Sequence, residues 1–326
     1  MKKVLITGSL GLTGSETAKF FVSKGWEVVG IDTNMRSKFF GTPDKQDEFT
    51  LKIDIRDENA IDVLFKAHKF DAIIHTAAQP SHDFSKNNVL LDFEVNARGT
   101  LNLLEATRKH CPEAVFVHVS TDKVYGENMD REDLQETETR YDHWLPFDES
   151  TPLDKTMRSP FGCSKLASDI YAQEYGYCYG MKVGVFRPGC ITGKAHEGTE
   201  LHGFLAYLAK CIKEGITYRI FGYKGKQVRD QIHAYDLANA FYHFVEDPKS
   251  GVYNVGGGEE RSVSILEAIK MIEKETRKKA ITEYIKEPRL GDRIWDVHDC
   301  SKFMKAYPDW SYKYSLLDII KDLCAK

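Results

Sequence analysis

The chain has 326 residues, 42% of them hydrophobic, and its 45 Lys and Arg against 49 Asp and Glu give a net charge of −4. These values predict a large buried core, exclude a disordered protein, and give no reason to expect a nucleic-acid partner. No apolar run reaches the ~20 residues of a membrane span, and glycines interrupt the apolar N-terminal stretch, so we expect a buried first strand and no membrane partner. Seven cysteines without a CxxC pair favour a reduced, cytoplasmic protein.

Short apolar runs alternate with helical patterns from the N-terminus to about residue 190. The predicted strands are Val4–Thr7, Glu27–Ile31, Thr50–Ile53, Ala72–His75, Val115–Val119 and Lys182–Phe186. The predicted helices are Glu16–Lys24, Glu58–His68, Leu91–Lys109 and Cys163–Tyr179. This alternation predicts a doubly wound α/β fold, in which helices cover both faces of a parallel sheet.

The pattern changes after Arg187, where the helix Leu201–Glu214 lacks flanking strands and short β signals appear at Tyr218–Phe221 and Gly251–Val255. We therefore predict a cofactor-binding Rossmann domain over residues 1–187 and a smaller, mainly substrate-binding lobe over residues 188–326. Segments near 228–256 and 294–307 are expected to return to the first domain. The lobe would close over the carboxyl ends of the strands, where such sheets bind ligands.

Three glycines, Gly8, Gly11 and Gly14, directly follow the first predicted strand. They permit a tight turn and close approach of the backbone to a pyrophosphate, and N–H groups at the start of the next helix would face that charge. Because strand, loop and helix occur in the order that this motif requires, we predict a dinucleotide cofactor here.

The ends of the second and third predicted strands carry carboxylates. Asp32 can accept hydrogen bonds from both hydroxyls of the adenosine ribose and would repel a ribose phosphate, which favours NAD over NADP. Arg36 lies close in sequence and could weaken that preference, although an arginine in this position is more often solvated. For Asp54 two interpretations stay open, a contact to the adenine edge or a cap for the helix that starts near Asp57.

Five segments carry a resemblance to one known family: Gly8–Gly14, His75–Gln79, Asn96–Thr100, Ser120–Gly126 and Lys226–Asp230 with His233. Together they resemble the extended short-chain dehydrogenase/reductase (NAD-dependent epimerase/dehydratase) family over nearly the whole chain. The resemblance implies a Rossmann fold and NAD as the cofactor. It also implies cofactor contacts by Gly8, Gly11, Leu12, Asp32, Arg36, Asp54, Ile55, Ala77, Ala78, Gln79, Asn96, Ser120, Lys165 and Pro188.

In this family a Ser or Thr, a Tyr and a Lys act together, and the resemblance assigns Thr121 as the hydroxyl and Lys165 as the lysine. The tyrosine position, one helical turn before the lysine, holds Phe161, which can neither accept nor donate a proton. Three interpretations stay open: an enzyme with another acid/base group, an engineered Tyr-to-Phe variant, or a catalytically impaired binding protein. The candidates for another acid/base group are Asp122, Cys163, Tyr125 and an ordered water.

Lys123 distinguishes between two reactions of the family. Members that act as 4,6-dehydratases carry an Asp-Glu pair after the Thr, whereas here the pair is Asp122-Lys123, which argues against a dehydratase. The segment Thr121–Gly126 resembles the CDP-paratose/CDP-tyvelose 2-epimerase group, as do Glu136–Tyr141, Asp148–Ser150, Gly162–Lys165 and Gly225–Asp230. That resemblance implies an epimerase that inverts carbon 2 of a CDP-linked sugar, in which bound NAD oxidises the carbon to a ketone and returns the hydride to the other face.

Residues that would bind the substrate are inferred mainly from the resemblance. They are Thr121, Arg229 for the diphosphate of the nucleotide sugar, Arg293 as a second arginine, and His202 in the segment 194–203. This segment carries two histidines and two glutamates, but its spacing fits a substrate loop better than a metal site, so no metal is expected. Family members pair through helices equivalent to Leu91–Lys109 and Phe161–Tyr179, and we expect a homodimer.

Overall fold

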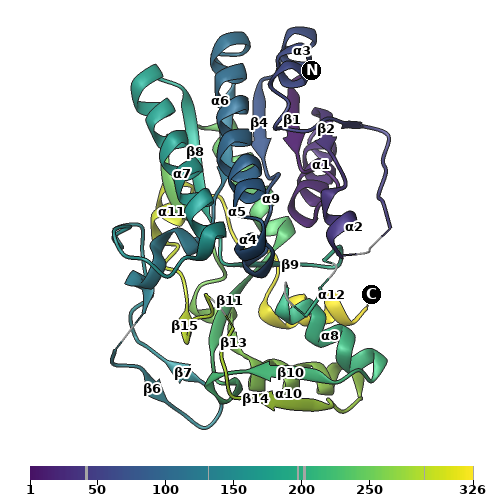
Figure 1. The fold of residues 1–326 in the computed structure, drawn as a ribbon, viewed down its shortest axis with the longest axis vertical. Coiled ribbons are helices and arrows are strands. Elements are labelled where there is room, and N and C mark those ends of the chain that lie inside the picture. The colour runs from purple at the N-terminus through teal and green to yellow at the C-terminus, as the bar shows by residue number, and fades with distance from the viewer. Residues whose placement is uncertain (41–42, 131, 197, 201–202, 290, 326) are drawn as a thin grey trace.

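The computed structural model describes all residues except 41–42, 131, 197, 201–202, 290 and 326, and the side chains of all described residues but 38–40. Its largest sheet contains seven parallel strands in the order β12-β8-β5-β4-β1-β2-β3 (Figure 1). Their bounds are β1 Lys3–Thr7, β2 Glu27–Asp32, β3 Thr50–Lys52, β4 Ala72–His75, β5 Val115–Val119, β8 Lys182–Arg187 and β12 Gly251–Asn254. The strand order starts at β1 in the middle and proceeds outward in both directions, which confirms the doubly wound α/β fold.

Helices cover both faces of this sheet because the strands are apolar on both. In β1, Val4 and Ile6 belong to one core and Leu5 to the other, as the alternation of side chains along a strand requires. The first core includes residues of α1 (Leu12–Ser23), α9 (Ala234–Glu246) and α11 (Ser301–Ala306). The second includes residues of α3 (Glu58–Ala67), α6 (Gly99–His110) and α7 (Ser159–Tyr179).

The helix that was predicted over Leu91–Lys109 is interrupted. It consists of α5 (Val89–Phe93), a π-helical turn (Glu94–Arg98) and α6. Such turns often occur at functional sites, and this one carries Asn96 toward α7. The short helices α2 (Met35–Phe40) and α4 (His82–Asn87) follow β2 and β4 at the carboxyl end of the sheet.

A smaller lobe lies below the carboxyl ends of the large sheet in Figure 1. Its four-stranded sheet contains β9 (Cys190–Thr192), β11 (Val228–His233), β13 (Ser262–Ser264) and β15 (Trp295–Asp296), and a second pair is β10 (Tyr218–Phe221) with β14 (Thr282–Ile285). Three helices share a core with these strands: α8 (Phe204–Glu214), α10 (Ile265–Thr276) and α12 (Leu316–Cys324). The hairpin of β6 (Gln135–Glu136) and β7 (Tyr141–Asp142) extends from the same end.

Segments of the C-terminal half contribute to the large sheet and its helix layers. Strand β12 pairs with β8, so that Gly251 lies opposite Gly184, while α9 packs on α1 and α11 packs on β12. The two lobes are therefore interleaved along the chain. Across the described residues, no helix is long and apolar enough to cross a membrane.

Candidate active site

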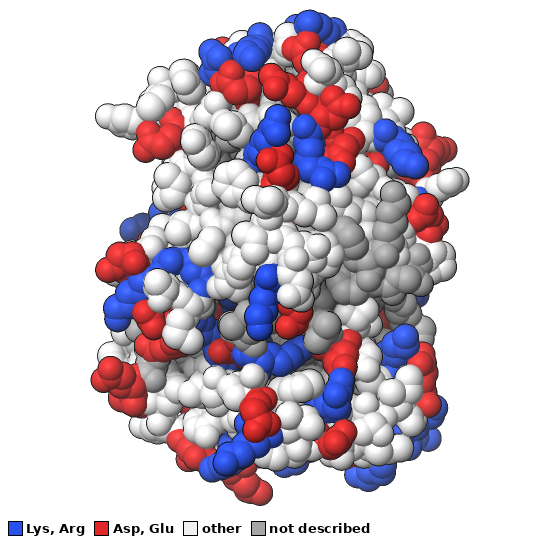
Figure 2. All heavy atoms as spheres, in the orientation of Figure 1, with Lys and Arg blue, Asp and Glu red and all other residues white. Residues whose placement is uncertain are grey.

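A cleft of about 480 Å³ separates the carboxyl ends of the large sheet from the smaller lobe. Residues that follow β1, β2, β3, β4, β5 and β8 form one side, and residues of the smaller lobe form the other. Figure 2 shows Lys and Arg side chains gathered around a hollow between the upper and lower parts of the molecule. The cleft thus occurs where an open α/β sheet binds its ligand.

The loop after β1 is packed too tightly for side chains. Gly8 has φ of 68°, and a Cβ there would lie 2.8 Å from the backbone of Ala77. A Cβ on Gly14 would lie 2.1 Å from the carbonyl oxygen of Gly8. Helix α1 begins at Leu12, and within the described residues no side chain caps its first N–H groups. These N–H groups and the cleft-lining Gly8, Gly11 and Leu12 form a cradle that fits the pyrophosphate of a dinucleotide.

Carboxylates at the ends of β2 and β3 also line the cleft. Asp32 accepts hydrogen bonds from the backbone N–H groups of Leu10 at 3.1 Å and Asn34 at 2.8 Å, which fixes the shape of the loop. Asp54 accepts hydrogen bonds from the backbone N–H and guanidinium of Arg56. The alternative that Asp54 caps a helix is wrong, because Asp57 caps α3 instead. Two further predicted cofactor contacts, Arg36 and Ile55, line the same part of the cleft.

Ala77 and Ala78 line the wall after β4, whereas Gln79 and Asn96 are buried behind it. The Asn96 amide donates to the backbone oxygen of Gln79 at 3.0 Å and to Ser164 Oγ at 3.0 Å. The prediction that Gln79 and Asn96 contact the cofactor is therefore corrected. Their amides are already bonded within the protein, and they join the wall to α7.

Thr121 and Lys165 both line the cleft, as do Ser120 and Pro188. The Lys165 ammonium is buried and donates to the carbonyl oxygen of Val119 at 2.8 Å. Burial lowers the pKa of Lys165 to about 8. The Thr121 hydroxyl donates to Asp122 at 2.9 Å. The structure thus brings together a hydroxyl and an amine whose proton is held less tightly than usual.

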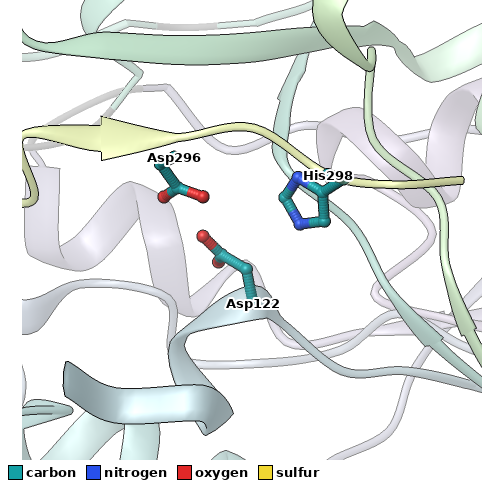
Figure 3. A group of neighbouring side chains, drawn as sticks. All are labelled: Asp122, Asp296 and His298. Atoms are coloured by element: carbon teal, nitrogen blue, oxygen red, sulfur yellow. The ribbon is translucent and has the colours of Figure 1, made fainter. Parts of the chain in front are cut away.

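A buried cluster of charges lies beside this part of the cleft (Figure 3), where the carboxylates of Asp122 and Asp296 face each other beside the ring of His298. Lys123 Nζ lies 2.7 Å from one oxygen of each carboxylate and reaches the cleft. Burial would lower the pKa of Lys123, but the two carboxylates outweigh it and raise that pKa. The Lys123 ammonium therefore takes the position that a metal ion would occupy between two carboxylates.

The ring of His298 also contacts a carboxylate outside the cluster shown in Figure 3. Its Nδ1 lies 3.0 Å from the carboxylate oxygens of Asp230. Burial would lower the pKa of His298, but Asp230 outweighs burial and raises it to about 9. Burial, followed by the nearby Asp296, raises the pKa of Asp122. The carboxylates of the cluster thus stabilise the charged forms of Lys123 and His298.

The family model for the NAD dependent epimerase/dehydratase family matches residues 4–256. The chain belongs to this family. It is 34% identical to CDP-paratose 2-epimerase of Salmonella typhi, over 98% of both chains. It is also 28% identical to a putative UDP-glucose 4-epimerase of Methanocaldococcus jannaschii, over 81% of this chain and 79% of that one.

Solved structures of epimerases share the fold of this family member. The UDP-glucose 4-epimerase of Thermus thermophilus in complex with NAD has a TM-score of 0.84 and 27% identity, covering 99% of this chain and 98% of that one. The UDP-glucose 4-epimerase of Thermotoga maritima with UDP-glucose also has a TM-score of 0.84, at 25% identity and with 99% and 97% covered. The protein is therefore an enzyme of the epimerase/dehydratase family with NAD as its cofactor, which confirms the family and cofactor predictions.

The residues expected to carry out proton transfer have different surroundings. Phe161 lines the cleft one turn before Lys165, at the position where the resemblance predicts a tyrosine. Cys163 lies between them on the opposite, exposed side of α7, so the prediction of a catalytic role for Cys163 is wrong. Tyr125 is fully buried and donates to Asn254 at 2.7 Å, while burial raises its pKa. Asp122 is held by Lys123 and by Thr121, and these contacts keep it from a substrate hydroxyl.

The two arginines predicted for the substrate have different surroundings. Arg229 lines the cleft and pairs with Asp292. The prediction that Arg293 binds the substrate is corrected. Its guanidinium points away from the cleft and donates to Asp130 at 2.8 Å and to the carbonyl oxygen of Met157 at 3.0 Å. The predicted residue His202 falls outside the described residues.

The polar residues of the cleft that sequence reasoning missed include His82, Gln227 and Arg289. Arg289 donates to the carbonyl oxygen of Glu200 at 2.6 Å and lines the cleft as Arg229 does. His82 is in the segment after β4, and its position after the carboxyl end of a parallel strand was a signal that could have found it. For Arg289 the sequence offers no comparable signal, since several charged residues occur near it.

Proposed function

We propose that the enzyme inverts carbon 2 of a CDP-linked sugar through a keto intermediate. The relative from Salmonella typhi supports this, because it is named a CDP-paratose 2-epimerase and matches the chain over almost its full length. The observation that carries the choice between epimerase and dehydratase is Lys123. It occupies the position of the dehydratases' second carboxylate, and its ammonium is fixed between Asp122 and Asp296 at 2.7 Å. Elimination of water needs a free acid and a free base, and this pair supplies neither.

In the proposed mechanism the protein positions the sugar and moves its hydroxyl proton. NAD, when bound in the cleft, would supply the acceptor and donor of a hydride for the sugar carbon. Thr121 would hold the oxygen of that carbon, and Lys165, with its lowered pKa, would hold the nicotinamide ribose and favour loss of the hydroxyl proton. The sugar then presents its other face, and the same hydride returns, so that no second substrate is consumed.

The diphosphate would be bound by Arg229, with Arg289 as a second arginine of the cleft. Arg229 is buried, and its guanidinium pairs with Asp292 and donates to the carbonyl oxygens of Val228 and Arg293. A diphosphate would compete with this carboxylate for the guanidinium, and Arg binds phosphate oxygens in the same bidentate manner. Both arginines are therefore assigned to the nucleotide rather than to the reacting carbon.

We also propose a homodimer through α5 and α7, which pack side by side. Phe93 on α5 and Ile170 and Tyr171 on α7 are exposed by 50%, 42% and 48%. A second copy would bury them. Light scattering at micromolar concentration should give the dimer mass for the wild type and the monomer mass for Ile170→Glu, and a wild-type monomer would contradict the proposal.

The reaction is tested by incubating the enzyme with CDP-, UDP- and GDP-sugars in D₂O and following the sugar by NMR. Inversion at carbon 2 of a CDP-sugar, without deuterium from the solvent at that carbon, is the expected outcome. A keto-sugar product with solvent deuterium would instead identify a dehydratase. Tight CDP-sugar binding without inversion would identify the impaired binding protein that Phe161 suggests.

A further inference from the structure

A histidine lies against the phenylalanine that occupies the tyrosine position. The ring of His82, at the start of α4, has its centroid 5.1 Å from that of Phe161 at an angle of 76°. Both residues line the cleft. Helices α4 and α7 pack together, and the backbone N–H of Phe161 donates to Ser85 Oγ at 3.2 Å. The imidazole is therefore fixed beside the position from which the family's tyrosine would act.

Ser159 orients this imidazole. Its Oγ lies 2.7 Å from His82 Nδ1. A hydroxyl bonded to Nδ1 fixes the plane of the ring and selects the role of Nε2, as partners of catalytic histidines do. Contacts with the Phe161 ring and with the Ser159 hydroxyl thus help to fix the position of the His82 ring.

The backbone around Ser159 is strained, which shows that its position is imposed. Ser159 has φ of 64° and Met157 has φ of 60°, and both are left-handed conformations that non-glycine residues rarely adopt. Such strain is unfavourable and is concentrated at functional sites. Pro160, at the first turn of α7, directly follows and restricts the chain further. The strained backbone of this segment therefore places the Ser159 hydroxyl within hydrogen-bond distance of His82.

The other groups considered for proton transfer are placed elsewhere. Cys163 is on the exposed side of α7, Tyr125 is buried against Asn254, and Asp122 is paired with Lys123. A second histidine of the cleft, His196, lies in the smaller lobe. Its ring packs directly against Gly203, so closely that a Cβ at Gly203 would lie 2.4 Å from it. Among the described histidines, His82 is the one whose ring contacts that of Phe161.

We propose that His82, oriented by Ser159, is the acid/base group that takes the place of the missing tyrosine. This inference rests on the proposed epimerase function. As the C–H bond of the sugar carbon breaks and its hydride passes to NAD, the O–H bond breaks and its proton passes to the imidazole. The carbon is oxidised to a ketone, the cofactor is reduced, and His82 becomes imidazolium. On the opposite face the hydride returns to the carbon and the imidazolium returns its proton to the oxygen.

His82→Gln tests the role, with His68→Gln, a partly buried histidine beside Lys3 at the start of β1, as the matched control. General acid–base groups contribute on the order of 10²–10⁴-fold, so kcat should fall by at least 100-fold in His82→Gln and stay unchanged in the control. The dissociation constant for CDP and the bound NAD content should stay within twofold in both. Imidazole in the buffer should restore part of the activity of His82→Ala.

Phe161→Tyr provides the complementary test, because it supplies the phenol of the family. Added to His82→Gln, it should restore activity at least tenfold. Turnover of His82→Gln within threefold of wild type would overturn the inference and leave the epimerase function intact. A wild type that inverts none of the nucleotide sugars would overturn the function first, and this inference with it.

Ser159→Ala tests the positioning of the ring without any turnover. The ¹⁵N resonances of the His82 ring in the substrate-free protein should move toward the other tautomer when the hydroxyl is removed, while Ser159→Thr should keep the wild-type pattern. We expect kcat to fall about tenfold in Ser159→Ala with KM unchanged. Unchanged ring resonances in Ser159→Ala would contradict the role of Ser159.

Discussion

Two regions of the wall of the active-site cleft are built in different ways. On the side of the β1 loop the backbone itself makes the surface, because Gly8, Gly11 and Gly14 leave no room for side chains. On the side of Lys123 the surface is made by buried charges that join distant segments, since Lys123 and Asp296 are 173 residues apart. The first side should therefore tolerate changes of charge but no added atom. The second should tolerate changes of shape but no lost charge.

The largest effect should come from Gly14→Ala. Its Cβ would lie 2.1 Å from the Gly8 carbonyl oxygen, and a backbone atom cannot move aside as a flexible side chain can. We expect a loss of several kcal/mol of stability and no retained NAD, measured by urea unfolding and by the absorbance of released cofactor. The control is Gly176→Ala in α7, where the nearest atoms lie at 3.6 Å and alanine should stabilise the helix.

Lys123→Met tests the other side of the comparison. It keeps much of the shape of the side chain but leaves the buried carboxylates of Asp122 and Asp296 without their shared cation. Removing one partner of a buried pair costs about 3–5 kcal/mol of unfolding free energy, and Lys123→Met/Asp296→Asn should recover part of it. Lys182→Met, at an exposed ion pair with Glu113, should show no resolvable loss. Equal losses in both lysine variants would contradict the comparison.

The pH dependence of stability should locate His298 in the same cluster. Because its pKa is raised from 6.5 to about 9, its stabilising charge is fully present below pH 6.5 and is lost as the pH rises through 9. Between pH 6.5 and 8 the free energy of unfolding should therefore fall by about 2 kcal/mol, and His298→Gln should abolish this fall. The pKa of Lys165 is lowered to about 8, so its contribution has the opposite sign: it makes stability rise with pH, and only above pH 8. Urea unfolding at pH 6.5, 7 and 8 measures the slope, and an equal slope in His298→Gln would refute the assignment.

Asp32→Asn should have the smallest effect, because it changes charge on the backbone-built side. The amide keeps the size of the side chain and one acceptor for the N–H groups of Leu10 and Asn34. We expect NAD affinity to fall about tenfold, the equivalent of about 1.4 kcal/mol, and NADP affinity to fall less. Calorimetry with each cofactor measures both. Equal losses would show that Asp32 acts through the loop and not on the ribose.

Local motifs predicted the backbone-built side well. The glycine spacing and the strand ends that carry Asp32 and Asp54 are visible over a few residues, and the structure places all of them in the cleft. The strand assignments succeeded for the same reason, since continuous β-branched runs indicate buried parallel strands. The interruption of the predicted helix by the π-helical turn Glu94–Arg98 leaves no comparable mark in hydrophobic periodicity.

The side built from side chains could not be predicted from spacing. Asp296 and His298 join Asp122 only through the fold. Arg293 was predicted as the second arginine but donates away from the cleft, whereas Arg289, which sequence reasoning missed, lines it. The prediction for Cys163 was wrong for a simpler geometric reason. Two residues along a helix correspond to about half a turn, so Cys163 faces away from the side of α7 that carries Phe161. Long-range pairing, not residue type, decided which of these side chains reach the cleft.

The edge strand β12 has a consequence for how the chain is made. It covers β8, whose other neighbour is β5, but it comes from Gly251–Asn254, long after β8 has left the ribosome. During that interval the apolar edge of a half-finished sheet has no hydrogen-bonding partner, and such edges associate with other chains. Nascent chains that end between Arg187 and Gly251 should therefore depend on chaperones, whereas chains that have passed Asn254 should not.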